Sequence, residues 1–152
     1  MNLNSMQPFW ALVIAVASAQ FVKPFFYYLK NKKFDWIIVI ASGGYPSSHT
    51  AGVVALATAV GLSESVNSTI FAVTLAFSIV VAYDAANVRY YAGQNIKITQ
   101  QLIKDIQTLT NSKFDDPIYL TKVKEVLGHK WFEVIGGALH GLLVALVIYY
   151  FS

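Results

Sequence analysis

The sequence contains no cysteine and little charge. Without cysteine among its 152 residues, the chain can form neither a disulfide nor a thiolate site. Only 12% of the residues are charged, against about 25% in ordinary soluble domains. Hydrophobic residues make up 56% of the chain, and its mean hydropathy is +0.53. So little polar surface cannot cover a water-soluble particle of this size, and we therefore predict one integral membrane domain over residues 1–152.

Apolar stretches separated by polar turns predict an all-α fold, a small bundle of transmembrane helices. The expected spans cover residues 8–29, 50–62, 69–86 and 131–151. Residues 1–20 lack the positively charged start of a cleavable signal peptide, so we expect the first apolar run to be retained as a span.

Two other patterns fall between these spans. Residues 35–40 are apolar but too few to cross a bilayer, so we expect an interfacial or re-entrant segment there. In residues 94–110, apolar side chains recur at helical spacing, which predicts an amphipathic helix on the membrane surface. These side chains are Ile98, Leu102, Ile106 and Leu109.

Basic residues are distributed unevenly between the polar segments. Lysines and an arginine occur in 30–33, 89–104 and 122–130, whereas the turn at 63–68 has neither. Because cytoplasmic loops carry the excess of Lys and Arg, we expect the first three segments on the cytoplasmic face of a bacterial cell membrane. The net charge of +3 therefore bears on orientation, and it indicates no nucleic-acid partner.

Two histidines open apolar helices, and their surroundings suggest a phosphate site. Residues 43–48 form a Gly/Ser-rich turn that leads into His49 and the span after it. A helix start of this kind offers backbone N–H groups and a positive dipole end to an anion. His129 precedes the last span, and Glu133 lies four residues later on the same helical face. The predicted topology brings both motifs to one membrane face.

Each motif also has a purely structural explanation. Ser47 or Ser48 fits an ordinary helix N-cap, or else contributes an oxyanion contact beside a proton-donating His49. Glu133 is favoured at a helix start whatever its role, whereas as a catalytic partner it would orient the His129 imidazole. The residues alone leave both explanations open.

Other polar residues are expected near the same face or within the spans. Arg89 suits bidentate phosphate binding and Lys23 a point-charge contact, unless both serve only to set the topology. Asp84 is expected to contact a ligand or to pair with one of these cations. His140, deep in the last span, is expected to hydrogen-bond another helix. Because no group of residues has metal-ligand spacing, we expect neither a metal nor another cofactor.

Small residues recur along two of the spans. Ala51, Ala55 and Ala59 form one stripe, and Gly137 with Gly141 has the spacing of a second. Such stripes let membrane helices approach closely, so they also suggest a face for a homodimer.

Three motifs carry a family resemblance that covers nearly the whole chain. They are residues 43–50 (GGYPSSHT), 83–93 (YDAANVRYYAG) and 128–137 (GHKWFEVIGG). As a set they resemble the divergent branch of the type-2 phosphatidic acid phosphatase superfamily, which also contains bacterial acid phosphatases and vanadium haloperoxidases. The resemblance implies a reduced form of their all-helical core and metal-free hydrolysis of a lipid phosphate.

The resemblance also implies a role for each polar residue of these motifs. His129 would attack phosphorus and form a phosphohistidine, with Glu133 in place of the Asp that orients this imidazole. His49 would protonate the leaving oxygen. Ser47 and Ser48 would contact the substrate, and Ser48 occupies the Gly of the usual Pro-Ser-Gly-His pattern.

The chain departs from the superfamily at the phosphate-binding arginines. Lys122 and Val123 stand where the superfamily has Ser-Arg, and Lys30 stands where its first motif has Arg, seven residues after Lys23. Arg89, in the branch's own motif, is the expected substitute. Two hypotheses follow: a lipid-phosphate phosphatase, or a catalytically inactive membrane protein that binds phosphate or lipid, as a transport component or scaffold.

The predicted orientation is testable with single cysteines, because the natural chain has none. A cysteine introduced at Ser65 should react with a membrane-impermeant maleimide added to intact cells. A cysteine introduced at Ser112 should react only after the cells are lysed. Labelling of Ser112→Cys from outside intact cells would contradict the assigned orientation.

Overall fold

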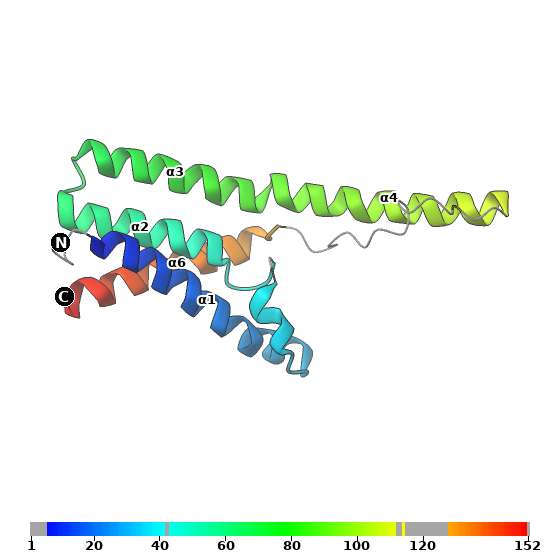
Figure 1. The fold of residues 1–152 in the computed structure, drawn as a ribbon, viewed down its shortest axis with the longest axis horizontal. Coiled ribbons are helices and arrows are strands. Elements are labelled where there is room, and N and C mark those ends of the chain that lie inside the picture. Colours follow the sequence, from blue (N-terminus) through cyan, green and yellow to red (C-terminus); the bar gives the residue numbers. More distant parts are fainter. Residues whose placement is uncertain (1–5, 42, 112–113, 115–127, 152) are drawn as a thin grey trace.

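The computed structural model describes residues 6–41, 43–111, 114 and 128–151 (Figure 1). Within these residues every regular element is helical, so the predicted all-α membrane bundle is confirmed. The elements are α1 (Gln7–Asn31), the 3₁₀ helix η2 (Trp36–Ile40), α2 (Ser48–Glu64), α3 (Thr69–Ala86), α4 (Val88–Thr110) and α6 (Trp131–Phe151).

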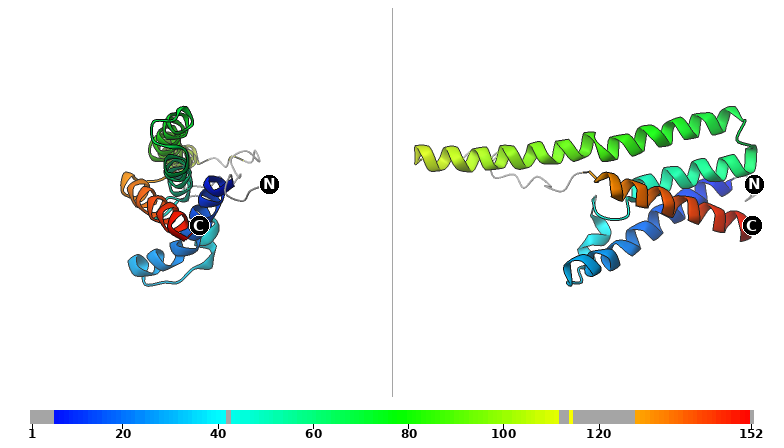
Figure 2. Two further views of the ribbon diagram at one scale, coloured as in Figure 1. Left: turned by 90° about the vertical axis from the view of Figure 1, so that its left-hand side faces the viewer. Right: turned by 180° about the vertical axis from the view of Figure 1, so that it is seen from behind.

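Helices α1, α2, α3 and α6 pack together as the bundle. They alternate in direction along the chain (Figures 1 and 2). The start of α1, the turn between α2 and α3, and the end of α6 lie together at one end. The starts of α2 and α6 and the end of α3 lie at the other end. The chain therefore brings both histidine motifs to the same end of the bundle.

Among the residues that the structure describes, three stretches are long and apolar enough to cross a membrane: Gln7–Asn31, Thr69–Thr110 and Trp131–Phe151. α2 has 17 residues, or about 25 Å of helix, and it packs against α1, α3 and α6. The outer surface of α3 is apolar and exposed, as expected where lipid covers a helix. Its exposed side chains include Ile70, Val73, Phe77 and Val80. The chain is a multi-pass membrane protein.

Small residues hold the helices of the bundle close together. Alanines of α1 and α2 form the central buried cluster, together with one from α6: Ala11, Ala15, Ala19, Ala51, Ala55, Ala59 and Ala145. A methyl group on Gly137 or Gly141 would collide with backbone oxygens of Ser47 or Ala51. Close approach of backbones is what small residues permit in membrane helices.

The same contacts correct the prediction that these stripes offer a dimer face. Ala51 and Ala55 are fully buried, and both stripes face neighbouring helices of the same chain. They are therefore not available to a second copy.

η2 carries the chain from the end of α1 back towards the start of α2. Its first turn is capped by Asp35, whose carboxylate accepts a hydrogen bond of 2.9 Å from the Ile37 N–H. Trp36, Ile37 and Ile40 are all exposed. An apolar and exposed short helix is compatible with the interfacial placement expected for residues 35–40, which stays a prediction.

α4 differs from its prediction in start and direction. It begins at Val88 rather than at Gln94, directly after a junction at Asn87. In Figure 1 it continues along the line of α3 and projects beyond the other helices, whereas a surface helix would turn across the end of the bundle. The Asn87 N–H still donates to the Tyr83 carbonyl, so the helical hydrogen bonding is almost unbroken and α3 sets the direction of α4.

Candidate functional site

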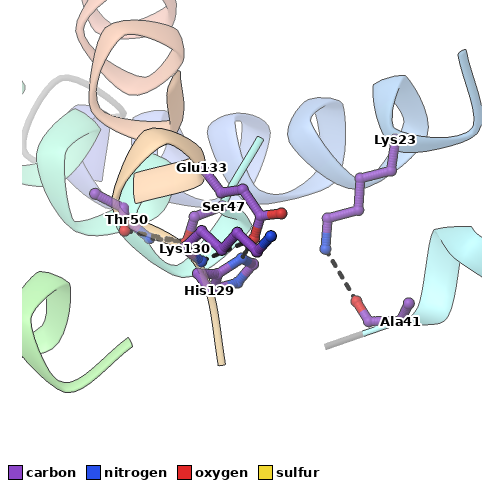
Figure 3. Close-up of polar contacts among 7 residues, drawn as sticks. All are labelled: Lys23, Ala41, Ser47, Thr50, His129, Lys130 and Glu133. Carbon is purple, nitrogen blue, oxygen red and sulfur yellow. Dashed lines mark hydrogen bonds and ion pairs between the residues drawn. The ribbon is translucent and has the colours of Figure 1, made fainter. Parts of the chain in front are cut away.

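Polar residues on or next to α1, α2 and α6 gather at one end of the bundle (Figure 3). Glu133 lies in the first turn of α6, His129 lies two residues before that helix, and His49 lies at the start of α2. Lys23 reaches the same region from α1. This is the convergence that the predicted topology requires.

Two hydrogen bonds and burial fix the position of His129. Its backbone N–H donates to the Ala85 carbonyl at 2.9 Å, and its side chain is only 1% exposed. Its Nδ1 lies 3.1 Å from Oε2 of Glu133. The same carboxylate oxygen accepts a hydrogen bond of 3.2 Å from the Lys130 N–H. Glu133 is thus fixed in the position where it orients the imidazole.

This geometry leaves the other ring nitrogen of His129 with a free lone pair. A carboxylate only accepts hydrogen bonds, so the imidazole proton belongs on Nδ1. Nε2 is buried, and no group in the described part of the chain hydrogen-bonds to it. Buried polar atoms normally have a partner, and those that lack one often mark a chemical role. The Nε2 lone pair is therefore available to a ligand, whereas the Nδ1 proton is used by Glu133.

His49 faces His129 from the second residue of α2. The two rings meet edge to face, with 6.0 Å between their centroids. His49 is exposed, in contrast to the buried His129. The His129 imidazole is thus fixed and shielded from water, while the His49 imidazole can exchange protons with solvent.

The turn before α2 is docked on α6 by hydrogen bonding and by ring contacts. The Ser47 N–H donates to the Glu133 carbonyl at 2.9 Å. The Tyr45 ring stacks on Phe132, with centroids 5.8 Å apart, and lies where a side chain of Gly136 would be. These contacts set the position of His49 relative to Glu133.

Ser47 takes the structural role that the sequence left open. Its hydroxyl accepts hydrogen bonds from the Thr50 N–H at 3.3 Å and from the Thr50 hydroxyl at 3.0 Å, so it is the N-cap of α2. Ser48 is the first residue of the helix and is buried. Both hydrogen bonds use Ser47 as an acceptor, so its own O–H, Ser48 and backbone N–H groups remain the candidates for an oxyanion contact at this turn.

Lys23 is a buried cation, only 1% exposed in spite of its charge. Its Nζ donates to the Ala41 carbonyl at 2.9 Å (Figure 3). An ammonium has three donors, and this hydrogen bond uses one of them. Lys23 also interacts electrostatically with Glu133 and His49, which places its charge at the histidine pair.

Arg89 is paired with Asp84 at the junction of α3 and α4. Its Nε lies 2.6 Å from Oδ2 of Asp84, and the two side chains are 53% and 37% exposed. Both are close enough to interact electrostatically with His49. Lys30 is different, because it is exposed in the last turn of α1, seven residues beyond Lys23.

Several contacts at this site have no signature in the sequence. The carbonyl groups of Ala41 and Ala85 hold Lys23 and His129, and any residue can supply a carbonyl. Thr50 was also missed, although it is 1% exposed and bonded to Ser47. Within the described residues no group of three His, Cys, Asp or Glu could hold a metal ion.

The sequence profile of one known family, described as the Divergent PAP2 family, matches residues 4–144. The chain belongs to the divergent PAP2 family. The resemblance inferred from the three motifs is thereby confirmed.

A full-length relative is known within the bacteria. The chain is 36% identical over 156 residues to the uncharacterized membrane protein YuiD of Bacillus subtilis (strain 168), covering 99% of each chain. No solved structure matches this chain.

Gly128, just before His129, presses against the start of α4. It has φ of +84°, and a Cβ there would collide with the backbone of Arg89 and Tyr90. Gly44 has a similar φ of +93° but nothing within 4 Å of its Cβ position. A side chain at either glycine would strain the backbone, but only a side chain at Gly128 would also overlap neighbouring atoms. Comparing substitutions at the two positions therefore separates these two costs.

We expect Gly128→Ala to destabilise the protein more than Gly44→Ala does. Both substitutions force an alanine into left-handed backbone, at about 1–2 kcal/mol. Gly128→Ala adds an overlap with backbone, typically about 1–3 kcal/mol more. Thermal unfolding of the two variants in detergent measures the difference. Equal losses would show that the loop before His129 does not press on α4.

Proposed function

We propose that this protein hydrolyses a lipid phosphate without a metal, through a phosphohistidine at His129. The observation that carries the proposal is the buried Nε2 of His129, which has no hydrogen-bond partner in the described residues, on a ring whose centroid lies 6.0 Å from that of His49. A lone pair held in this way is suited to attack an electrophilic phosphorus atom.

In the first step His129 Nε2 attacks phosphorus while the bond from phosphorus to the ester oxygen breaks. His49, in its protonated form, gives its proton to the departing oxygen, so the alcohol leaves neutral. Glu133 accepts the Nδ1–H bond throughout and stabilises the positive charge that develops on the ring.

In the second step water attacks the phosphohistidine. His49, now neutral, takes a proton from that water, the N–P bond breaks, and inorganic phosphate leaves. The electron pair of the N–P bond returns to Nε2, and both histidines regain their starting states. Because His49 is exposed while His129 is buried, water reaches the acid–base residue directly.

Positive groups around His49 suit the charge of the transferred phosphoryl group. Lys23 and Arg89 both interact electrostatically with this imidazole, and the start of α2 adds backbone N–H groups and the buried Ser48. Fixed donors of this kind are the main device of phosphoryl-transfer enzymes. Ser47, Asp84 and Lys30 fit supporting roles: a helix cap, a partner for Arg89, and a surface cation.

The surroundings favour a lipid substrate. The site lies at one end of a bundle whose outer surface is apolar, so a head group there would sit at a membrane boundary. Lysines of 30–33 lie near this end, and by the positive-inside rule it faces the cytoplasm of a bacterial cell.

The second candidate function is phosphate or lipid binding without catalysis, in transport or as a scaffold. The observation in its favour is the ion pair between Arg89 and Asp84, whose Nε and Oδ2 atoms are 2.6 Å apart. This pair neutralises the arginine that would otherwise contact the phosphoryl group. Lys122 and Val123, where the superfamily has Ser-Arg, supply no further arginine. A site with too little free positive charge would bind phosphate and fail to turn it over.

The experiment is phosphate release by the purified protein in detergent. Phosphatidate, a polyprenyl diphosphate and an aryl phosphate serve as substrates. We expect release from a lipid substrate, reduced to background in His129→Ala and by about 10²–10⁴-fold in His49→Ala. His140→Ala is the matched control, because His140 lies away from the pair and bonds Ser18 of α1.

Two outcomes contradict hydrolysis. One is no release from any substrate by folded protein, and the other is release that His129→Ala leaves unchanged. If vanadate or phosphate raises the unfolding temperature without turnover, the binding-only function is supported instead.

A further inference from the structure

In Figure 1 the start of α6 lies beside the junction of α3 and α4. A pocket of about 210 Å³ is lined by residues of these segments. Its lining residues are Ala86, Asn87, Tyr90, Tyr91, Lys130 and Trp131. Ala86 is buried at its base, while Tyr91 and Trp131 are 61% and 53% exposed. The proposed reaction uses none of these side chains.

The pocket is adjacent to the histidine pair but distinct from it. Lys130 and Trp131 follow His129 directly in the chain, but the residues that line the pocket include neither histidine nor Glu133. A ligand in the pocket would therefore contact side chains other than those of the histidine pair.

The lining chemistry suits an anionic head group. It contains one charged residue, the cation Lys130, and no acid. Asn87, the two tyrosines and the tryptophan add neutral hydrogen-bond donors around it. Lys130 lies beside Glu133 in Figure 3, and this exposed residue also lines the pocket.

The apolar surroundings distinguish a lipid from a free anion. The volume is below the range of about 300–1,000 Å³ for pockets that enclose a whole ligand, so only a head group fits. Two exposed apolar stripes begin at the pocket and run along the bundle, as acyl chains would. They are Tyr83 and Ile79 on α3, and Ile135 and Leu139 on α6.

We propose that this pocket binds the head group of an anionic phospholipid, with its acyl chains along α3 and α6. Tyr and Trp residues are at home at the membrane boundary, and basic pockets between membrane helices bind anionic head groups. The site is independent of hydrolysis at His129. Its occupant bridges the helix that carries Asp84 and the helix that carries Glu133.

The test is the unfolding temperature of the full chain in detergent, titrated with phosphatidylglycerol, phosphatidylcholine or inorganic phosphate. We expect phosphatidylglycerol to raise it more than phosphatidylcholine, and inorganic phosphate to leave that difference unchanged. Lys130→Ala should weaken the apparent affinity for phosphatidylglycerol about fivefold, the contribution of one lysine near an anionic lipid surface. Tyr91→Ala should weaken it as well, because it removes one wall.

Matched variants make the outcome decisive. Lys97→Ala removes an exposed lysine of α4 outside the pocket, and Tyr149→Ala an exposed tyrosine at the other end of the bundle. Both should keep the full phosphatidylglycerol effect, as should His129→Ala. The proposal is overturned if Lys130→Ala behaves like Lys97→Ala, or if inorganic phosphate alone reproduces the shift in His129→Ala, where the histidine pair is incomplete. It is also overturned if His129→Ala abolishes the effect, since the lipid would then bind at the histidine pair.

Discussion

The structure depends on how closely the start of α6 approaches the start of α2. Gly136 and Gly137 leave no side chain between the two helices, so the Tyr45 ring and the Ser47 carbonyl lie directly against α6. The Ser47 N–H then reaches the Glu133 carbonyl. Since His49 follows two residues after Ser47, this contact decides whether the two imidazoles meet. In a membrane, where helices gain little from hiding apolar surface, such backbone proximity is the main source of packing energy.

That contact gives the two histidines different surroundings. His129 is buried, with its Nδ1 held by Glu133 and its backbone N–H held by Ala85. His49 is exposed and faces it across 6.0 Å between ring centroids. Nucleophilic attack calls for a fixed imidazole such as that of His129, and proton transfer calls for one in contact with solvent such as that of His49. The proposed lipid pocket beside the start of α6 would add a second contact between this end of the bundle and the bilayer.

Short-range patterns made much of this predictable. The spacing of His129 and Glu133 predicted one shared helical face, and the two side chains do meet, although His129 lies two residues before α6. The alternation of apolar runs and turns brings His49 to the same end. His140 was expected to hydrogen-bond another helix, and it does so with Ser18 at 2.8 Å. The remaining features depend on tertiary contacts. Any residue can supply a backbone carbonyl such as that of Ala41, so the sequence gives no sign of this contact. The junction at Asn87, after which α4 continues in line with α3, is set by backbone hydrogen bonding.

The central claim is that both imidazoles serve one anion. Its most direct measurement is an experimental structure of the protein in lipid with vanadate, a mimic of the phosphoryl group in flight. The account predicts vanadium bonded to Nε2 of His129, with His49 hydrogen-bonded to the oxygen on the opposite side. Vanadate bound elsewhere at saturation, or two histidines too far apart to contact one ion, would contradict it.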